Sequence, residues 1–539
     1  MAWITPTGKL YLLKGIPLDT TYEHTILFQT PSAQQAYFLD SDKIVQAFTN
    51  LTYQRVNRDR VRVQALADNL YSCNYMVFQN SAYGNKYFYA FIKEINYIND
   101  NTSEIIYELD VLQTWHFNYS LEECFIERQH SLTDGIGDNI LPEPVELGEY
   151  VFNDSGTANK KYQKIIDLSD IYYVVCVADI TQQQEGISVN IYDGIFQGCT
   201  LYAYAPLELV ELNQFINSFV TAGHPDSIIA IYTCPQTCIA RDDEGDNPYL
   251  VLDTYSGAQQ NHYQPPAITT ADTVDTHTVK NNKLFTYPYN FYNVDNGNGT
   301  SLALRYEFFT NLLPKFQIHS VLTQPVTLTL RPVNYKGSGS ETVNTEVLSV
   351  SNFPLCAWVN DSWQAWVANQ SGLVDMTAWT GAMTSVAAFA TGHPILGTLT
   401  ALNTVMDALK QTYTASLKAD VCKGNLNNSG VNTAIGKNTF YGGRLSVNRN
   451  YAKVIDDFFT KFGYAMNKIG IPMRNARPHW TYVKTAGCII RANSNEGLPC
   501  DDEKRICEIY DKGLTWWRYG NEIGDYSLYD NSPSNQGGE

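Results

Sequence analysis

One long segment of the chain carries almost no charge. From Gly372 to Val421 the sequence reads GLVDMTAWTGAMTSVAAFATGHPILGTLTALNTVMDALKQTYTASLKADV, and no Asp, Glu, Lys or Arg occurs between Met376 and Met406. No lysine or arginine occurs from Gly337 to Leu409, although 17% of the chain is charged. This segment therefore needs an apolar or self-packed environment.

The motif Gly392-His393-Pro394 divides this segment into two predicted helices, because proline ends one helix and suits the first turn of the next. The first arm, Leu373 to Thr391, has small residues four positions apart, a spacing that lets helices approach closely. Its length of roughly 29 Å is close to the thickness of the hydrocarbon core of a bilayer, about 30 Å. The second arm carries one apolar stripe at helical spacing: Leu399, Leu402, Met406, Leu409, Tyr413 and Leu417.

Three environments suit this predicted helical hairpin. The first arm is only weakly apolar and has Asp375 near one end, so it is a poor constitutive transmembrane helix. The hairpin is therefore the core of a soluble protein, a segment stored in a soluble particle that later meets a membrane, or an arm that binds a partner. The residues expected to carry membrane activity are Leu373, Val374, Met376, Trp379, Met383, Val386, Phe389, His393, Pro394, Ile395, Leu396, Leu399, Leu402, Val405, Met406 and Leu409.

The first 130 residues read as strands and turns. The runs Met76–Asn80 and Lys86–Ile92 flank a Gly-Asn turn, which predicts a hairpin. The runs Ile105–Asn118 and Cys124–His130 are further apolar segments rich in β-formers.

The middle of the chain begins with GIGDNILPEPVELGEY, from Gly135 to Tyr150, a segment rich in proline and glycine that predicts a domain boundary. After it, apolar runs rich in β-branched residues predict strands at Ile171–Ala178, Ile228–Thr233 and Val326–Leu330. We expect small β-rich domains here.

Length and composition agree with a mainly β, multidomain protein. The chain has 539 residues, enough for several domains, and 13% of them are aromatic. Its eleven cysteines are an odd number spread thinly, and the amino terminus lacks the pattern of a secretion signal. We therefore expect folding in a reducing cytosol.

The net charge of −18 lies mostly in the middle of the chain. Residues 1–130 carry 10 basic and 14 acidic groups (−4), residues 131–439 carry 14 and 29 (−15), and residues 440–539 carry 13 and 12 (+1). A protein that grips nucleic-acid phosphates would show a basic patch instead. Any DNA that meets this protein is expected to pass without specific binding.

Two sequence patterns resemble metal-binding motifs, but each lacks part of the required ligand set. Cys234 and Cys238 form a CxxxC motif, but no second pair follows at zinc spacing. The acidic run from Arg241 to Asp246 lacks the ligand order of a calcium loop. We therefore predict no metal site and no cofactor.

The candidate nucleophiles are equally incomplete. Cys500 with Cys507, and Cys124 with His130, have no third residue that would orient them, and no GxSxG or HExxH motif occurs. We predict that the protein is not an enzyme and has no catalytic residues.

Long ordered runs at both ends of the chain carry a family resemblance. YMVFQNSAYGNKYFYAFIKEI, YELDVLQTWHFN and FIERQH, together with Phe458–Tyr464, Asn475–Val483 and Gly513–Trp517, resemble the distal tail-knob proteins of short-tailed phages that infect Gram-positive bacteria, the group with small protein-primed genomes. The glycine- and alanine-rich insert fits as well. The part from about 150 to 370 agrees with the family in position and length alone.

This resemblance implies a structural virion protein at the tail tip, made in the host cytoplasm. It implies a homo-hexameric tube whose β-barrel wall combines residues 1–133 and 437–539, with outer β-rich domains at 134–368. It also implies a hydrophobic loop at 369–436 that plugs the lumen and later penetrates the host cytoplasmic membrane, while genome DNA passes through. Proximal tail or collar proteins are the expected partners.

An adhesion module for cell-wall polysaccharide is the alternative function, with the loop as a structural core hairpin. In that case Trp358, Trp363 and Trp366 offer a stacking platform for sugars. These three tryptophans also suit the base of the loop or a membrane interface.

Overall fold

The structure is a computed structural model of the chain. It describes residues 8–51, 59–79, 84–153, 162–166, 168, 170–177, 191–192, 195–196, 200–222, 227–241, 248–254, 265, 267–297, 299–321, 327–336, 348–351, 355–359, 439–493 and 497–533. The chain divides into two compact units. Unit 1 comprises Met1–Leu147, His277–Leu284 and Arg449–Glu539, and unit 2 comprises Gly148–Thr276 and Phe285–Asn448. The boundary between Leu147 and Gly148 lies within the proline- and glycine-rich segment.

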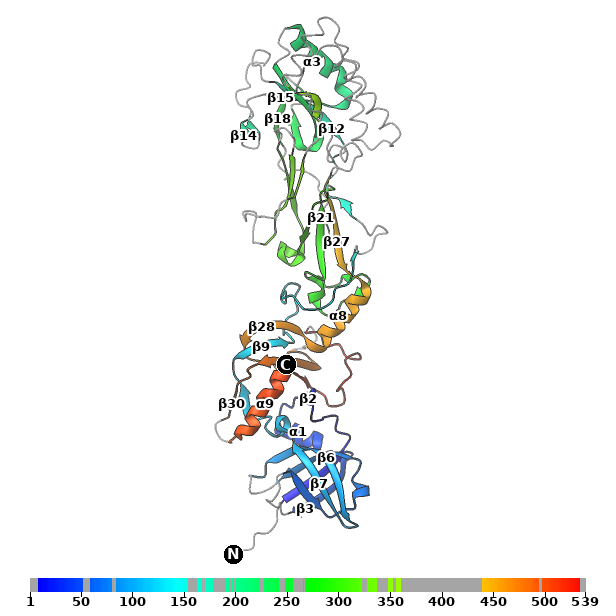
Figure 1. Ribbon diagram of the computed structural model, residues 1–539, viewed down its shortest axis with the longest axis vertical. Coiled ribbons are helices and arrows are strands. Elements are labelled where there is room, and N and C mark those ends of the chain that lie inside the picture. The colour runs from blue at the N-terminus through cyan, green and yellow to red at the C-terminus, as the bar shows by residue number, and fades with distance from the viewer. Residues whose placement is uncertain are drawn as a thin grey trace, which may run out of the picture. The chain divides into compact units, whose positions relative to one another are not determined.

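Unit 1 contains a six-stranded antiparallel sheet in the order β3-β1-β5-β6-β7-β4. Figure 1 labels β3, β6 and β7 of this sheet. Its strands are β1 (Gly8–Lys14), β3 (Ile44–Leu51), β4 (Arg60–Val63), β5 (Cys73–Gln79), β6 (Tyr87–Asn99) and β7 (Thr102–Leu109). Successive residues of β5 face opposite sides, so that Tyr75 and Val77 enter one apolar cluster and Met76 enters another. Both faces of this sheet are therefore covered, which explains its apolar runs.

The predicted hairpin is confirmed. Strands β5 and β6 pair antiparallel from Tyr75↔Phe91 to Gln79↔Tyr87. Before β6, Gly84 and Asn85 both have positive φ angles, 64° and 63°, which glycine and asparagine tolerate best.

A second sheet of unit 1 combines strands from both ends of the chain in the order β2-β31-β29-β9-β28. Its strands are β2 (His24–Ile26), β9 (Cys124–Gln129), β28 (Tyr464–Gly470), β29 (Trp480–Ala486) and β31 (Leu514–Trp517). Strand β9 pairs with β28 on one side and β29 on the other, and β2 runs parallel to β31. The short strands β8 (Tyr119–Leu121) and β30 (Ile490–Ala492) pair in the same way across the chain. The amino- and carboxy-terminal parts thus fold as one body.

Two short helices interrupt the amino-terminal region that the sequence predicts as strands and turns only. Helix α1 (Pro31–Phe38) starts with Pro31 after Thr30, whose side chain accepts a hydrogen bond from Ala33 N at 3.2 Å. Helix α2 (Val111–Thr114) interrupts the predicted run Ile105–Asn118, because Asp110 accepts from Gln113 N at 3.1 Å and caps a new helix. The continuous strand expected there is wrong beyond Leu109, whereas the strand expected at Cys124–His130 is confirmed as β9.

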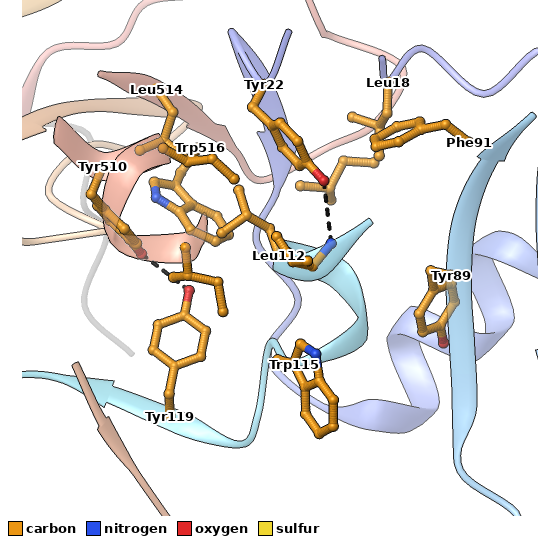
Figure 2. Close-up of a cluster of buried hydrophobic side chains, with 14 of the residues drawn as sticks. Leu18, Tyr22, Tyr89, Phe91, Leu112, Trp115, Tyr119, Tyr510, Leu514 and Trp516 are labelled. Atoms are coloured by element: carbon orange, nitrogen blue, oxygen red, sulfur yellow. Dashed lines mark hydrogen bonds between the residues drawn. The ribbon is translucent and has the colours of Figure 1, made fainter. Parts of the chain in front are cut away.

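The large core of unit 1 is aromatic (Figure 2). Tyr22 donates a hydrogen bond from its hydroxyl to Leu109 O at 3.3 Å and accepts one from Val111 N at 3.2 Å. The Tyr119 and Tyr510 hydroxyls lie 3.3 Å apart beside Trp516. Tyr510 belongs to helix α9 (Cys500–Lys512), so the core joins that helix to amino-terminal elements. Helix α8 (Arg449–Phe462) and β20 (His277–Thr278) complete unit 1.

Unit 2 is built from small sheets. The largest have the orders β10-β27-β21-β22 with β11 also on β27, β15-β12-β16-β26, and β23-β24-β25. The elements of unit 2 are β10 (Tyr150–Phe152), β11 (Gln163–Lys164), β12 (Ile171–Val177), β13 (Ile191–Tyr192), β14 (Ile195–Phe196), β15 (Thr200–Tyr204), α3 (Leu209–Thr221), β16 (Ile228–Pro235), β17 (Ile239–Arg241), β18 (Val251–Thr254), β19 (Thr273–Val274), β21 (Asn290–Asp295), β22 (Ser301–Leu304), β23 (Phe316–Val321), β24 (Thr327–Pro332), β25 (Leu348–Ser351), β26 (Leu355–Val359) and β27 (Tyr441–Val447).

The three strands predicted in the middle of the chain are confirmed as β12, β16 and β24. Helix α3 contributes Leu212, Ile216 and Phe219 to the same apolar cluster as β12 and β16. The fold is mainly β and multidomain, as the composition indicates.

Candidate functional site

The predicted membrane-active residues all lie between 360 and 438, outside the described residues. The structure does describe both attachment points of this segment. Strand β26 precedes it and strand β27 follows it, and both strands belong to unit 2. The candidate site therefore consists of the two attachment strands, β26 and β27, and of helix α8, which follows β27 in the chain.

The two attachment strands belong to different sheets. Among the described strands, β26 lies at the edge of its sheet and pairs with β16, with Ala230 opposite Val359 and Tyr232 opposite Leu355. Strand β27 is an interior strand, because β21 pairs with one side and β10 and β11 pair with the other. The second attachment point is thus held by backbone hydrogen bonds on both sides.

Two glycines let aromatic rings pack directly on β27. A Cβ atom on Gly442 would lie 2.6 Å from Cζ of Tyr292, which is fully buried. A Cβ atom on Gly443 would lie 3.0 Å from the Tyr162 ring and 3.3 Å from the Phe152 ring. The sequence YGGRLSV therefore needs glycine here for close approach of neighbouring side chains.

Arg444 fixes the same strand through its guanidinium group. Its Nε donates to Asn290 Oδ1 at 2.7 Å and its Nη2 donates to Thr273 O at 3.1 Å. The Nη1 atom lies 3.5 Å from the Asp272 carboxylate, which balances the buried charge. Just before the strand, Ile165 N donates to Phe440 O at 2.8 Å. Strand β27, the second attachment point, is therefore anchored within unit 2 by side-chain and backbone hydrogen bonds.

In unit 1, helix α8 carries a fully buried carboxylate, Asp456. Its oxygens accept from Lys280 N at 2.9 Å, Asn281 N at 3.0 Å and Asn281 Nδ2 at 2.8 Å. His277 Nε2 lies 2.8 Å from Asp456 Oδ2 and donates to it. One carboxylate on α8 therefore accepts hydrogen bonds from three residues of the segment His277–Leu284 and holds that segment against the helix.

A second buried carboxylate, Glu143, comes from the predicted linker. It accepts from Lys283 Nζ at 2.6 Å and from Ala465 N at 2.8 Å, and it pairs with Arg128. Burial lowers the pKa of Lys283, and the hydrogen bond from its ammonium to Glu143 opposes that shift. The ion pairs tie the linker, β9 and the segment His277–Leu284 together.

Asp134 is the other buried acid of this region. It accepts from the Tyr464 hydroxyl at 2.5 Å and from Asn282 N at 3.1 Å. Burial raises its pKa, while the charge of Arg477 and these hydrogen bonds act in the opposite direction. The polar contacts of Asp134, Glu143 and Asp456 hold elements together within unit 1.

The structure also places the candidate nucleophiles. His130 is buried; its Nδ1 accepts from Tyr482 N at 2.8 Å and its Nε2 donates to Thr460 O at 3.2 Å. Burial lowers the pKa of His130 to about 3, so it is neutral and both ring nitrogens are engaged. It is therefore unsuited to act as a base for Cys124. Cys500 is exposed, and Cys507 is half-buried on the same helix.

The remaining sequence patterns fall partly outside the described residues. Cys234 is buried in β16, and the acidic run continues into 242–247, which the structure does not describe. Within the described ranges, no three His, Cys, Asp or Glu side chains are grouped so that they could hold a metal ion. No helix in the same ranges is both long and apolar enough to cross a membrane.

The sequence reasoning missed the buried carboxylates of Asp134, Glu143 and Asp456. A signal for Asp456 was present, because it shares one face of α8 with Ala452, Ile455 and Phe459 at helical spacing. Glu143 gave no such signal, since its partner Lys283 is 140 residues away in the chain.

Comparison with known proteins gives consistent matches over nearly the whole chain. Residues 256–532 match the family described as the tail knob protein gp9 of Bacillus phage phi29, C-terminal domain, and residues 6–120 match the caudoviral major tail protein N-terminus. The tail knob protein gp9 of Bacillus phage PZA is 26% identical, with 98% of this chain and 99% of the relative covered. The tail knob protein gp9 of Bacillus phage phi29 is 25% identical with the same coverage.

A solved structure shares the fold. The tail knob protein gp12 of bacteriophage C1 matches with a TM-score of 0.62 at 13% identity, covering 96% of this chain and 98% of that one. The likeness therefore extends through both units.

Proposed function

Because this chain belongs to the family of the phi29 tail knob protein gp9, we propose that it forms the wall of the distal tail tube through which the genome is ejected. As a tail knob protein it is a structural component of the virion. The resemblance assigns the tube wall to residues 1–133 and 437–539, and outer β-rich domains to 134–368. Because residues 134–147 and 277–284 fold with the terminal parts in unit 1, and residues 439–448 belong to unit 2, we assign the wall to unit 1 and the outer domains to unit 2. The wall is a ring of six copies, held at the tail tip by other tail proteins, and it has no enzymatic role.

The shared sheet of unit 1 supports this assignment of the wall. A tube wall must keep its shape while DNA passes, so its two chain ends should not separate. Strand β9 lies between β28 and β29, and the aromatic core contains residues from both ends of the chain (Figure 2). The net charges of the two terminal parts, −4 for residues 1–130 and +1 for residues 440–539, are small. This suits a tube whose inner surface does not bind DNA phosphates.

We further propose that the loop 369–436 first plugs the lumen and then penetrates the host cytoplasmic membrane. The observation that carries this proposal is the charge-free stretch between Met376 and Met406, which is inserted between β26 and β27. Each of these strands is paired with its own sheet. The loop can therefore change its surroundings without breaking the pairing of either attachment strand.

A bilayer requires every backbone polar group to be paired within the inserted structure. Helical hairpins from six copies meet this requirement. Small residues let them pack closely, while threonine and serine face a wet channel and Trp379, Val386 and Phe389 face lipid. The membrane and the passing genome are thus proposed partners, and neither requires a cofactor.

Replacing 369–436 by a short Gly/Ser linker in an infectious phage tests this proposal. We expect normal virion assembly and adsorption, and loss of genome delivery. Val386→Asp and Phe389→Asp are point variants with the same expected effect, because a charge near mid-membrane costs about 2.5–3.5 kcal/mol. Val386→Leu is the matched control and should leave delivery unchanged.

The alternative function, adhesion to cell-wall polysaccharide, predicts a different result. If the loop is only a core hairpin, the linker variant loses folding or assembly. If adsorption fails while assembly is intact, the loop region binds the host surface, and the membrane proposal is wrong.

A further inference from the structure

Three cysteines from separate elements meet beside α9. Cys124 begins β9, Cys488 lies in the turn between β29 and β30, and Cys507 belongs to α9. The thiol of Cys488 lies close enough to the thiols of Cys507 and Cys124 to affect the pKa of each. All three are free thiols.

The position of Cys488 relative to Cys507 is set by Asp511. Its Oδ1 accepts from Cys488 N at 3.0 Å and from Thr485 Oγ1 at 2.8 Å. Asp511 lies four residues after Cys507, and therefore on the same face of α9. The turn and the helix are thus clamped at the place where the two thiols meet.

The two thiols differ in access and in chemistry. Cys488 is 8% exposed, whereas Cys507 is half-buried and can be reached from solvent. The neighbouring Cys488 thiol lowers the pKa of Cys507, and the Cys507 thiol raises the pKa of Cys488. The thiolate is the nucleophile in thiol–disulfide exchange. Cys507 is therefore placed to react first and Cys488 to resolve the product.

We propose that Cys488 and Cys507 form a thiol pair that low-molecular-weight disulfides, such as oxidised glutathione, convert to an internal disulfide. The Cys507 thiolate attacks one sulfur of the reagent, forms a mixed disulfide and releases one glutathione thiolate. Cys488 then gives its proton to solvent, and its sulfur attacks the Cys507 sulfur and displaces the second glutathione thiolate. Two protein thiols are oxidised and one small disulfide is reduced to two thiols.

The bond would join the β29–β30 turn to α9. That helix contributes Tyr510 to the aromatic core beside Trp516 (Figure 2). Closing the bond would therefore limit movement of α9 away from this core. A virion protein folds in a reducing cytosol and later meets oxidising surroundings, which is when such a bond forms. The chemistry itself does not depend on the function of the loop.

The test uses the purified full-length chain, incubated with oxidised glutathione at neutral pH and then trapped with a thiol-alkylating reagent. We expect intact mass spectrometry to show a loss of about 2 Da before alkylation, the mass of two hydrogen atoms. The number of alkylatable thiols should fall from eleven to nine. Peptide mapping should identify the Cys488–Cys507 bond, and dithiothreitol should restore both thiols.

Cys500→Ser is the matched control, because Cys500 is an exposed thiol on the same helix. This variant should still form the internal bond. Cys507→Ser should form none, and Cys488→Ser should stop at a glutathione adduct on Cys507. For the wild-type chain, an adduct that does not resolve, a Cys124–Cys488 bond, or eleven unchanged thiols would overturn the proposal. These wild-type outcomes need no variant and no membrane, so they are independent of the test of the loop.

Discussion

The buried carboxylate of Asp456 gives a prediction with a built-in control. Asp456 and Asp457 are adjacent on α8, yet the side chain of Asp456 is fully buried and that of Asp457 is 54% exposed. Asp456 accepts hydrogen bonds from two backbone amides and two side chains of the segment from His277 to Asn281. Asp457 lies 3.6 Å from Lys280 Nζ, which is half-exposed.

Asp456→Ala should therefore destabilise unit 1 strongly. The substitution leaves the backbone amides of Lys280 and Asn281 without their acceptor, and each buried donor left unsatisfied costs about 1–3 kcal/mol. The side-chain amide of Asn281 keeps Asp456 O and Thr460 Oγ1 as acceptors. Asp457→Ala removes one exposed ion pair, for which about 0–1 kcal/mol is typical. The free energies of unfolding of the two variants should then differ by about 3 kcal/mol.

Urea denaturation of both variants and the wild type, followed by tryptophan fluorescence, measures this difference. Trp480, Trp516 and Trp517 are buried in unit 1 and report on its unfolding. Asp456→Asn keeps one oxygen acceptor and should fall between the wild type and Asp456→Ala. Equal stability of the Asp456→Ala and Asp457→Ala variants would refute the reasoning that this carboxylate holds the segment to α8.

Two further predictions concern a buried acid and a glycine. Burial raises the pKa of Asp110 to about 7 from 3.8, so the folded protein binds more protons than the unfolded chain between about pH 4 and 7, and stability should fall as pH rises through that window, by up to about 4 kcal/mol. Asp110→Asn keeps the helix cap and should remove this pH dependence. Urea denaturation at a series of pH values measures it, and the same slope of unfolding free energy against pH in the variant and the wild type would contradict the prediction. Gly442→Ala should lower the thermal stability of unit 2 by about 1–3 kcal/mol, because its methyl group meets the Tyr292 ring. Gly497→Ala, at a position with open space around it, is the control in calorimetry and should show little change.

Local patterns predicted some of the strands. Alternation and β-branched runs predicted β5, β6, β12, β16 and β24, because each strand packs an apolar face against a core. The short helices α1 and α2, of eight and four residues, were missed because each is too short for its apolar residues to show a helical period. Thr30 and Asp110, the capping residues, were the available signal.

Contacts between distant residues could not be predicted from the sequence in the same way. Nothing near Glu143 indicates that Lys283 will neutralise it, and a proline-rich segment is expected to be solvated. Likewise, the sheet to which β26 or β27 belongs depends on partners far away in the chain. The candidate membrane-active segment stays a prediction from composition, because a long stretch without charge is visible in the sequence itself and the segment lies outside the described residues.

Leakage of dye from liposomes tests the central claim most directly. The intact protein, a variant lacking Gly372–Val421 and the isolated peptide of that sequence would be added across a range of pH. We predict that the peptide releases the dye, that the intact protein does so only after a trigger such as acidification, and that the deletion variant never does. Absence of leakage with both the peptide and the intact protein under every condition would contradict the claim that the loop penetrates membranes.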